Sequence, residues 1–325
     1  MKAIRCNEFS GIDALSIEDV APDKLLDNHL RVKVHAAGIN FPDSLIVAGR
    51  YQVKPELPFT PGMELSGEVV EVGNAVEGFA VGDRVSAVVT WGAFAEEAVV
   101  EAERAFKIPE ALDWNIAAAF PLAYMTAWHG LMNRAGMSAG DRVLVLGASG
   151  GVGLAALDIC RHIAAQAIAA ASSFDKLKVC ADYGAQHLIN YAEQDLRSVL
   201  KEQFGRAGLD IVCDPVGGDH FEAAFRSLGY GGRHLVIGFA GGAIPNLPVN
   251  LALLGERNLM GVYWADYANR NHGARPVLGA KLAGLILDGK LDPKIARIGT
   301  LDEAVEMLHT FSKRTAVGKL VIRFT

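Results

Sequence analysis

Cysteine is scarce in this sequence, and long apolar runs are missing. The chain has 325 residues and 4 cysteines (Cys6, Cys160, Cys180 and Cys213), with no C-x-x-C pair. Such wide spacing is not typical of a disulfide framework, so we expect reduced thiols in a cytoplasmic protein. The N-terminal residues show no apolar signal segment, and no run of about 18 apolar residues occurs. Neither secretion nor a membrane span is therefore expected.

Positive charge is also in short supply. The formal net charge is −6 at pH 7, which argues against a nucleic acid or an anionic membrane as partner. Hydrophobic residues make up 51% of the chain and charged residues 21%, enough for large buried cores and against disorder. A length of 325 residues predicts two domains at about 150 residues each.

Glycine, in contrast, is concentrated after one apolar run. Residues 142–146 form a short apolar run with β-branched Val143 and Val145, and Gly147, Gly150, Gly151 and Gly153 follow it before a helical pattern begins. A strand, a glycine turn and a helix N-terminus can hold a pyrophosphate, because the first N–H groups of the helix point outward. The dinucleotide fingerprint G-x-G-x-x-G is met with Ala148 in its first place. The pattern alone is weak evidence, so its context has to decide.

The context is a regular alternation of strands and helices. We predict strands at 142–146, 166–171, 187–189, 209–213, 233–237 and 259–263, with helices at 151–164, 174–183, 195–204 and 219–228 between them. This order predicts a doubly wound parallel α/β sheet of the Rossmann type. Residues 1 to about 120 instead show short strands split by glycine turns, which predicts a compact, barrel-like β domain. After helices at about 275–288 and 301–313, the final strand at 318–324 is expected to rejoin that first domain.

The end of the second predicted strand bears on the choice of cofactor. An NAD-binding fold usually has Asp or Glu there to hold the ribose hydroxyls. This chain has Ser172 and Ser173 instead, followed by Lys176, which favours NADP and its 2′-phosphate. The alternative is structural: Ser172 caps the next helix, Asp175 closes a capping box, and Lys176 is solvated.

Two further strand ends are expected to face the same crevice, because ligands bind at the carboxyl ends of parallel strands. One is 214–218, and the other begins with Gly238, Phe239 and Ala240. Their glycines would let the nicotinamide half approach the backbone, although ordinary turn chemistry also explains them.

Several stretches together resemble the medium-chain dehydrogenase/reductase superfamily, and within it the zinc-free NADPH:quinone oxidoreductase, zeta-crystallin-like branch. The stretches are 36–43 (AAGINFPD), 61–68 (PGMELSGE), 78–85 (GFAVGDRV), 146–153 (LGASGGVG) and 189–191 (INY). The resemblance covers essentially the whole chain. It implies a GroES-like catalytic domain at 1–121 and 265–325, into which an NADPH-binding Rossmann domain at 122–264 is inserted. It also implies a homodimer formed through the last Rossmann strand.

The resemblance implies a set of site residues. Asn40 and Asp43 would lie beside the nicotinamide and substrate, with Tyr51 at the mouth of the cleft as the first hydrogen-bond donor to test. Cofactor contacts would come from Thr126, Ser149, Gly150, Gly151, Val152, Gly153, Ser172, Lys176, Tyr191, Gly238, Phe239, Ala240 and Lys319.

The same comparison argues against a catalytic metal. Zinc alcohol dehydrogenases of the superfamily have a cysteine ligand where this chain has Asn40, and a histidine ligand where it has Met63. An amide and a thioether are poor replacements for thiolate and imidazole on Zn²⁺. No H-E-x-x-H pair occurs among the 9 histidines. We therefore expect no metal.

Without a Lewis acid, the expected chemistry is hydride transfer to an acceptor that is already electrophilic. The first hypothesis is an NADPH-dependent reductase of quinones. The second is an enoyl reductase acting on α,β-unsaturated ketones, aldehydes or acyl thioesters. The third is a non-catalytic NADPH-binding protein. The sequence does not choose among the acceptors.

Overall fold

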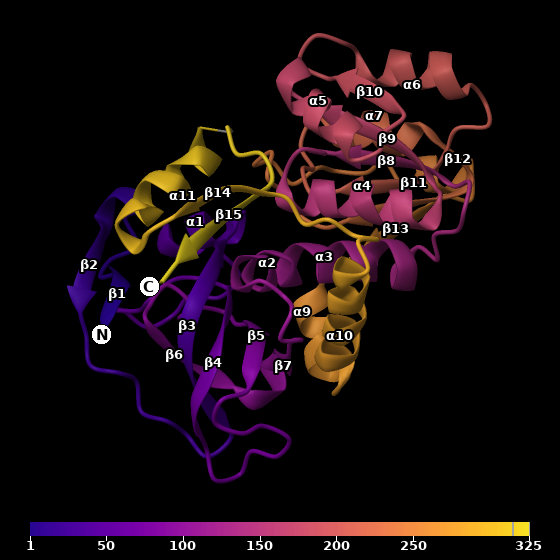
Figure 1. The fold of residues 1–325 in the computed structure, drawn as a ribbon. Helices are drawn as coiled ribbons and strands as arrows, with labels where there is room; N and C mark the ends of the chain where they lie inside the picture. Colours follow the sequence, from indigo (N-terminus) through magenta and orange to yellow (C-terminus); the bar gives the residue numbers. More distant parts are fainter. Residues whose placement is uncertain (314, 325) are drawn as a thin grey trace. The chain divides into compact units, whose positions relative to one another are not determined.

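The protein is described by a computed structural model that covers residues 1–313 and 315–324. The chain divides into two compact units. The first combines Met1–Leu122 with Ala268–Thr325, and the second is Ala123–Tyr267. In Figure 1 the second unit is the magenta-to-orange part of the chain, and the first combines its indigo and yellow ends. Among the described residues, no helix has the length and apolar character to cross a membrane.

The second unit is built on a six-stranded sheet in the order β10-β9-β8-β11-β12-β13, and every pairing in it is parallel. Its strands are β8 (Arg142–Leu146), β9 (Gln166–Ala171), β10 (His187–Asn190), β11 (Leu209–Asp214), β12 (Leu228–Val236) and β13 (Asn258–Gly261). The helices between them are α4 (Gly151–Ile163), α5 (Phe174–Asp182), α6 (Leu196–Phe204) and α7 (His220–Arg226). Figure 1 shows α4 on one side of this sheet and α7 on the other. The predicted doubly wound parallel sheet is confirmed.

Four of its strands differ from the predicted bounds, and two of these, β10 and β11, only end one residue later. β12 begins at Leu228, five residues before the predicted start at 233. Its pairing with β11 shifts register between Leu209 and Ile211, and the glycines at 229, 231 and 232 interrupt the apolar pattern there. β13 ends at Gly261, so Val262 and Tyr263 lie beyond the strand predicted at 259–263.

The first unit contains a seven-stranded sheet and a small two-stranded one. The larger sheet has the strand order β14-β15-β3-β4-β5-β7, and β6 also pairs with β3. The smaller sheet is formed by β1 and β2. The bounds are β1 (Lys2–Cys6), β2 (Leu15–Asp19), β3 (His29–Ile39), β4 (Glu64–Val72), β5 (Arg84–Val88), β6 (Glu97–Glu101), β7 (Ala105–Lys107), β14 (Ile295–Gly299) and β15 (Lys319–Arg323). The last strand does return to this unit, because β15 pairs antiparallel with β3.

The helices of the first unit are α1 (Phe41–Val47), α2 (Trp114–Ala119), α10 (Ala274–Leu287) and α11 (Ala304–Ser312). A short 3-10 turn, Leu301–Glu303, precedes α11, where one helix was predicted from 301. Helices α3 (Pro121–Trp128) and α9 (Trp264–Arg270) contain the two points at which the chain passes between the units.

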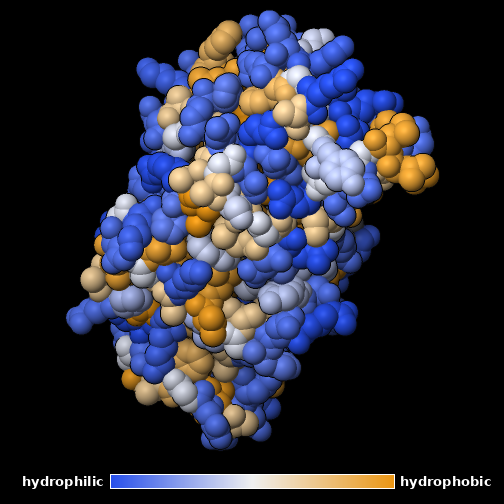
Figure 2. Space-filling model, turned by 90° about the vertical axis from the view of Figure 1, so that its right-hand side faces the viewer, coloured by the Kyte–Doolittle hydropathy of each residue, from blue (hydrophilic) through white to orange (hydrophobic). Residues whose placement is uncertain are grey.

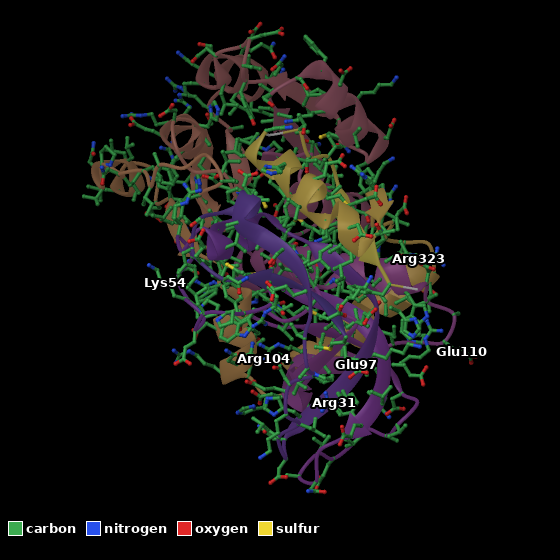
Figure 3. All side chains as sticks on the ribbon, turned by 90° about the vertical axis from the view of Figure 1, so that its left-hand side faces the viewer. Arg31, Lys54, Glu97, Arg104, Glu110 and Arg323 are labelled. Carbon is green, nitrogen blue, oxygen red and sulfur yellow. The ribbon has the colours of Figure 1, made fainter. Side chains whose placement is uncertain are left out.

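The core of the first unit is made of side chains from its strands, among them Leu30, Val32, Leu65 and Ile322. Charged side chains lie on the outer positions of the same strands. Arg31 on β3 and Glu97 on β6, both labelled in Figure 3, form an ion pair at 3.8 Å. The alternation of buried and charged positions is the period-two pattern from which these strands were predicted.

Candidate functional site

The glycine turn of the second unit has the geometry of a phosphate-binding loop. β8 ends at Leu146, the turn follows, and α4 begins at Gly151 after Gly150, an N-cap residue that makes no side-chain capping bond. The first N–H groups of α4 are therefore left for an external acceptor. Ser149 beside them is only 5% exposed. Ser149, Gly150, Gly151, Val152 and Gly153 thus lie together at one helix N-terminus.

Gly153 is required where the helix crosses the turn. A Cβ built at this position would lie 2.5 Å from the carbonyl oxygen of Gly147 and 2.6 Å from that of Ala148. Both contacts are to backbone, so the first turn of α4 packs directly on the loop that follows β8. This close packing is the role that the third glycine of the dinucleotide fingerprint plays.

The end of β9 carries the pair predicted to select NADP. Lys176 Nζ lies 3.1 Å from Ser172 Oγ, so the ammonium and the hydroxyl face the same space. The predicted helix cap is off by one residue: Ser173, not Ser172, is the N-cap of α5, and its Oγ accepts from the amide of Lys176. Ser172 is thereby left to pair with the ammonium. Tyr191, just after β10, packs against His220 with ring centroids 4.2 Å apart and the ring planes tilted by 38°.

The two remaining strand ends are joined by backbone hydrogen bonds. The amide of Ala240 donates to the carbonyl of Pro215 (3.1 Å), and that of Gly241 donates to the carbonyl of Val216 (2.8 Å). The 238–240 segment therefore lies against the 214–218 segment at the carboxyl end of the sheet. The Phe239 side chain is 37% exposed at this edge. Thr126 is half-buried on α3, within the second unit.

In the first unit, Asn40 and Asp43 lie at the start of α1. Asn40 is the N-cap residue, and its backbone amide donates to Asp43 Oδ2 at 2.7 Å. The exposed fractions are 8% for Asn40 and 0% for Asp43. Tyr51 follows α1 and is half-buried against the hydrophobic core of this unit. The structure therefore places the first two predicted catalytic residues together, with Tyr51 on the chain segment that follows them.

Lys319 belongs to the same cluster. Its ammonium donates to Asn40 Oδ1 at 2.5 Å and to the carbonyl of Ile39 at 3.4 Å, and it forms an ion pair with Glu64 Oε1. The Asn40 amide group donates to Glu64 Oε1 (2.9 Å) and to the carbonyl of Gly38 (3.3 Å). All three ammonium hydrogens and both amide hydrogens thus have acceptors inside the first unit. The Lys319 ammonium contacts Asn40 and Glu64, and its predicted contact with the cofactor stays a prediction.

Sequence reasoning missed Glu64 as a member of this cluster. Its second oxygen accepts from the amide of Leu122 at 2.9 Å, and the side chain is 0% exposed. A Cβ at Gly38 would overlap Glu64 Oε1, so glycine on β3 leaves room for the carboxylate. The available signal was the Glu64 position within the Gly62-Met63-Glu64 motif, together with a lysine that begins the last strand.

Burial raises the pKa of Asp43 to about 7. Hydrogen bonds from the Asn40 and Gly62 amides and the positive charge of Lys319 favour the carboxylate and lower the pKa. The nearby negative charge of Glu64 raises it. The desolvation effect is the largest of these, because the side chain has no contact with solvent. Asp43 is therefore a carboxyl group that changes its protonation near neutral pH.

This raised pKa predicts a pH-dependent stability. The folded protein keeps the Asp43 proton up to about pH 7, while the unfolded chain loses it near the ordinary aspartate pKa of 3.8. Between these pH values the unfolded state binds fewer protons, so the free energy of unfolding falls as pH rises. Compared with Asp43→Asn, the wild type is expected to lose up to about 1.4 kcal/mol per pH unit in this window. Urea unfolding of both proteins at pH 4.5, 5.5, 6.5 and 7.5 measures the difference.

Asp83→Asn serves as the matched control. Burial alone would raise the pKa of Asp83, but hydrogen bonds from Lys107 and from the Ala80 amide outweigh it and lower the pKa. Its contribution to stability is therefore lost only at more acidic pH, and its difference from wild type stays constant between pH 4.5 and 7.5. A constant difference for Asp43→Asn as well would contradict the raised pKa.

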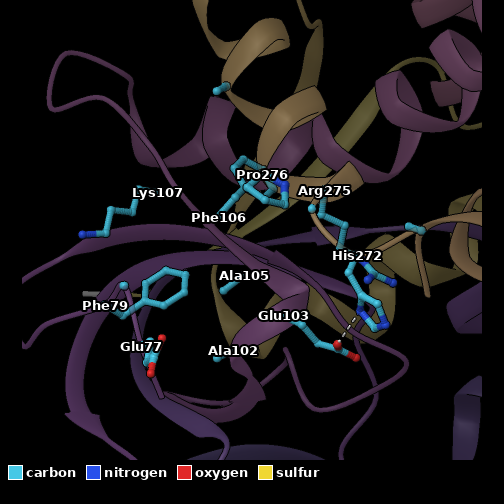
Figure 4. Close-up of a pocket in the computed structure, with 14 residues that line it drawn as sticks. Glu77, Phe79, Ala102, Glu103, Ala105, Phe106, Lys107, His272, Arg275 and Pro276 are labelled. Carbon is cyan, nitrogen blue, oxygen red and sulfur yellow. Dashed lines mark ion pairs between the residues drawn. The ribbon is translucent and has the colours of Figure 1, made fainter. Parts of the chain in front are cut away.

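A separate cavity of about 540 Å³ lies in the first unit, beside the N-terminus of α10 (Figure 4). Phe79, Phe106 and Pro276 line it, and Glu103 pairs with His272 at 3.4 Å on its rim. None of the residues predicted to be catalytic or to bind the cofactor lines this cavity.

Comparison with known proteins agrees with this architecture. Residues 26–110 match the alcohol dehydrogenase GroES-like domain, and residues 151–277 match the zinc-binding dehydrogenase family. The chain is 39% identical to the quinone oxidoreductase-like protein 2 of Bos taurus over 95% of this chain and 88% of that protein. It is 35% identical to the quinone oxidoreductase of Homo sapiens over 99% and 97% of the two chains.

Among solved structures, the Escherichia coli quinone oxidoreductase complexed with NADPH superposes with a TM-score of 0.91. That pair is 26% identical, and the match covers 100% of both chains. The doubly wound sheet and the GroES-like unit are therefore shared along the full length. The chain belongs to the quinone oxidoreductases of the medium-chain dehydrogenase/reductase superfamily, and it is an oxidoreductase.

Proposed function

We propose that the protein is an NADPH-dependent, metal-free reductase that transfers hydride to quinones. The observation that carries the cofactor choice is the contact between Lys176 Nζ and Ser172 Oγ at the end of β9. A cation and a hydroxyl suit a 2′-phosphate at the place where an acidic residue would hold free ribose hydroxyls. The NADPH bound to the E. coli relative supports the same choice. The second unit would hold the cofactor, and the first would supply the residues near the acceptor.

The buried ammonium of Lys319 supports the metal-free part of the proposal, although the matched family is named for zinc. A cation already lies between Asn40 Oδ1 and Glu64 Oε1. The Met63 side chain packs in the hydrophobic core of the first unit, 4% exposed. A bound Zn²⁺ would have to displace the ammonium and recruit ligands that prefer other partners. Metal analysis of the purified protein by mass spectrometry tests this, and stoichiometric zinc would overturn it.

When bound, reduced nicotinamide supplies the hydride, and the two electrons it carries convert a quinone to a hydroquinone anion that takes its proton from solvent. The chain's own task is to position the two reactants and to limit the cost of the developing charge. The Gly147–Gly153 turn would hold the pyrophosphate, and the Asn40–Lys319–Glu64 cluster, fixed by its own hydrogen bonds and ion pair, would be the polar group nearest the acceptor. Tyr51 stays the first donor to test.

Steady-state assays of NADPH oxidation distinguish the acceptor classes. We expect turnover with 1,4-benzoquinone that exceeds turnover with an alkenone or an enoyl thioester at equal concentration. Higher kcat/KM for the alkenone or thioester would make the protein an enoyl reductase. NADPH binding without turnover on any of the three acceptors would make it a non-catalytic binding protein.

Replacing Lys176 with alanine is expected to raise the KM for NADPH by about tenfold or more, the scale of one hydrogen bond to a charged group. The KM for NADH should change by less than about twofold, because NADH lacks the 2′-phosphate. Lys178→Ala, on the exposed side of the same helix, is the matched control and should leave both constants unchanged. Equal effects of Lys176→Ala on both cofactors would refute the assignment.

We also propose a homodimer formed through β13. This strand is the last one in the sheet, so one of its edges has no neighbouring strand within the described chain. Leu259 on it is 47% exposed, and Val249, Leu253 and Leu254 nearby in sequence are 80%, 78% and 77% exposed. Figure 2 shows a strongly hydrophobic protrusion in the upper right of the view. Leu253→Lys with Leu254→Lys would place two charges among the exposed apolar side chains. Sedimentation velocity should give a dimer for the wild type and a monomer for this double variant. A monomeric wild type would end the proposal.

A cytoplasmic location is proposed on the state of the cysteines. All four are unpaired and buried. Burial raises the pKa of Cys160 and of Cys180 to about 12, so the thiolates that form disulfides are rare. Cell fractionation with the untagged protein tests the location, and recovery in a membrane or secreted fraction would contradict it.

A further inference from the structure

Asp214 ends β11, and His234 lies beside it on β12. His234 Nε2–H donates to Asp214 Oδ2 at 3.0 Å. The two residues are 2% and 0% exposed, so this hydrogen bond is shielded from water. β11 and β12 pair in parallel with Val212 opposite His234 and Asp214 opposite Val236, which puts the His234 and Asp214 side chains on the same face of the sheet. The sequence pattern placed Asp214 in a strand end expected to face the cofactor, but it did not single out His234.

The other oxygen of Asp214 organises the loop that follows. Oδ1 accepts from the amides of Val216 and Gly217, both at 2.8 Å. This loop is hydrogen-bonded to the 238–241 segment, because the amides of Ala240 and Gly241 donate to the carbonyls of Pro215 and Val216. Both oxygens of one buried carboxylate are therefore used, one for the loop and one for His234. A buried carboxylate keeps its place only while such partners are present.

Among the described residues, the hydrogen bond to Asp214 is the one polar contact of the His234 imidazole. Its ring packs on Phe221 and Phe225, with centroids 4.6 Å and 5.8 Å away. Within residues 1–313 and 315–324, its Nδ1 atom has no hydrogen-bond partner. An apolar side chain would fill this space equally well, so packing alone does not explain a histidine. The bond to Asp214 is what distinguishes it.

We propose that His234 is a positioning residue that sets the affinity for the nicotinamide half of the cofactor, acting through Asp214 on the 214–218 and 238–241 segments. The inference rests on the proposed NADPH dependence. The strand order places β9 and its Ser172–Lys176 pair on one side of β8, and β11 and β12 on the other. A dinucleotide lies across this point of reversal. With the adenosine end on the β9 side, the nicotinamide end has to meet the segments that Asp214 holds.

The test compares three variants for binding of NADPH and of 2′,5′-ADP, which contains only the adenosine half. His234→Phe keeps the packing on Phe221 and Phe225 but removes the donor. His234→Gln keeps one N–H donor at about the same reach. His129→Phe is the matched control, because His129 is also buried among aromatic rings in this unit, against Trp264 and Tyr267. Dissociation constants come from NADPH fluorescence and from calorimetry.

For His234→Phe we expect about tenfold weaker NADPH binding and a 2′,5′-ADP constant within twofold of wild type, on the scale of one hydrogen bond to a charged group. His234→Gln should bind NADPH within about threefold of wild type, and His129→Phe should leave both constants unchanged. An equal loss of affinity for both ligands, or no loss for NADPH, would overturn the role of His234. If His234→Phe does not fold, tight NADPH binding by His234→Asn, whose amide is too short to reach Asp214, would overturn it instead.

The outcome also separates this inference from the proposed function. A wild-type protein that binds neither NADPH nor 2′,5′-ADP would refute both. A wild-type protein that binds NADPH and reduces quinones, with His234→Phe unchanged in both constants, would refute the positioning role alone.

Discussion

Replacing Lys319 with methionine is expected to destabilise the first unit by about 3–5 kcal/mol, the cost of breaking a buried ion pair by removing one partner. Lys319 and Glu64 have side chains that are 5% and 0% exposed. Methionine fills the space of the lysine stem but leaves the Glu64 carboxylate and Asn40 Oδ1 without their cation. The midpoint of urea unfolding measures the loss. A change below about 1 kcal/mol, the size typical of surface pairs, would contradict it.

A double variant separates charge from packing. Adding Glu64→Gln to Lys319→Met removes the unpaired negative charge, so most of the lost stability should return. Lys290→Met is the surface control: Lys290 pairs with Asp288 at 3.0 Å, but both side chains are more than half exposed (54% and 60%). It should cost less than about 1 kcal/mol. No recovery in the double variant would mean that Lys319 acts through its shape and not through its charge.

The order of the elements could be predicted well in the second unit. Strands and helices alternate there with clear apolar runs, and the predicted bounds 142–146 and 166–171 coincide with β8 and β9. The apolar pattern was less informative at the start of β12, because three glycines interrupt it where the pairing with β11 shifts register. In the first unit, α1 was not predicted, because seven residues beginning with Phe-Pro show no helical periodicity.

The candidate site was only partly predictable, because its cluster joins residues far apart in the chain. Asn40 and Asp43 could be named from a local motif. The pairing of Lys319 with Glu64 spans 255 residues, and nothing in either local pattern indicates the partner. The same is true of His234, whose contact with Asp214 depends on two strands that are adjacent only in the folded sheet. Strand order decides such contacts, so the exact partners required the structure.

The raised pKa of Asp43 shows how the folded environment changes the charge of a residue whose position a local motif predicts. A carboxyl group three residues after an N-cap position normally stabilises a helix as an anion. Here complete burial beside Glu64 opposes ionisation strongly enough to move the pKa to about 7. A local motif therefore predicted the position of the side chain, while the packing of the unit determines its charge.

Gly153→Ala is expected to have the second large effect, through the backbone and not through any side-chain contact. The added Cβ would lie 2.5–2.6 Å from the carbonyl oxygens of Gly147 and Ala148, and neither atom belongs to a flexible side chain. Helix α4 has to move away from the turn after β8, at a cost of about 3 kcal/mol by analogy with overpacked cores. The same movement turns the first N–H groups of α4 away from the pyrophosphate, so NADPH binding should fall by at least tenfold. Hydrogen exchange over 142–163 measures the local stability, and NADPH fluorescence measures the affinity.

Gly150→Ala is the control that separates this steric effect from a general need for glycine. Its backbone has φ −77° and ψ 173°, which any residue adopts. A Cβ there would meet only the Gly147 carbonyl oxygen, at an ordinary distance of 3.4 Å. Hydrogen exchange over 142–163 should therefore match the wild type in Gly150→Ala and increase in Gly153→Ala. Equal exchange in the two variants would show that α4 tolerates the added methyl group, and the close packing of helix on turn would then not be what holds the phosphate-binding loop in place.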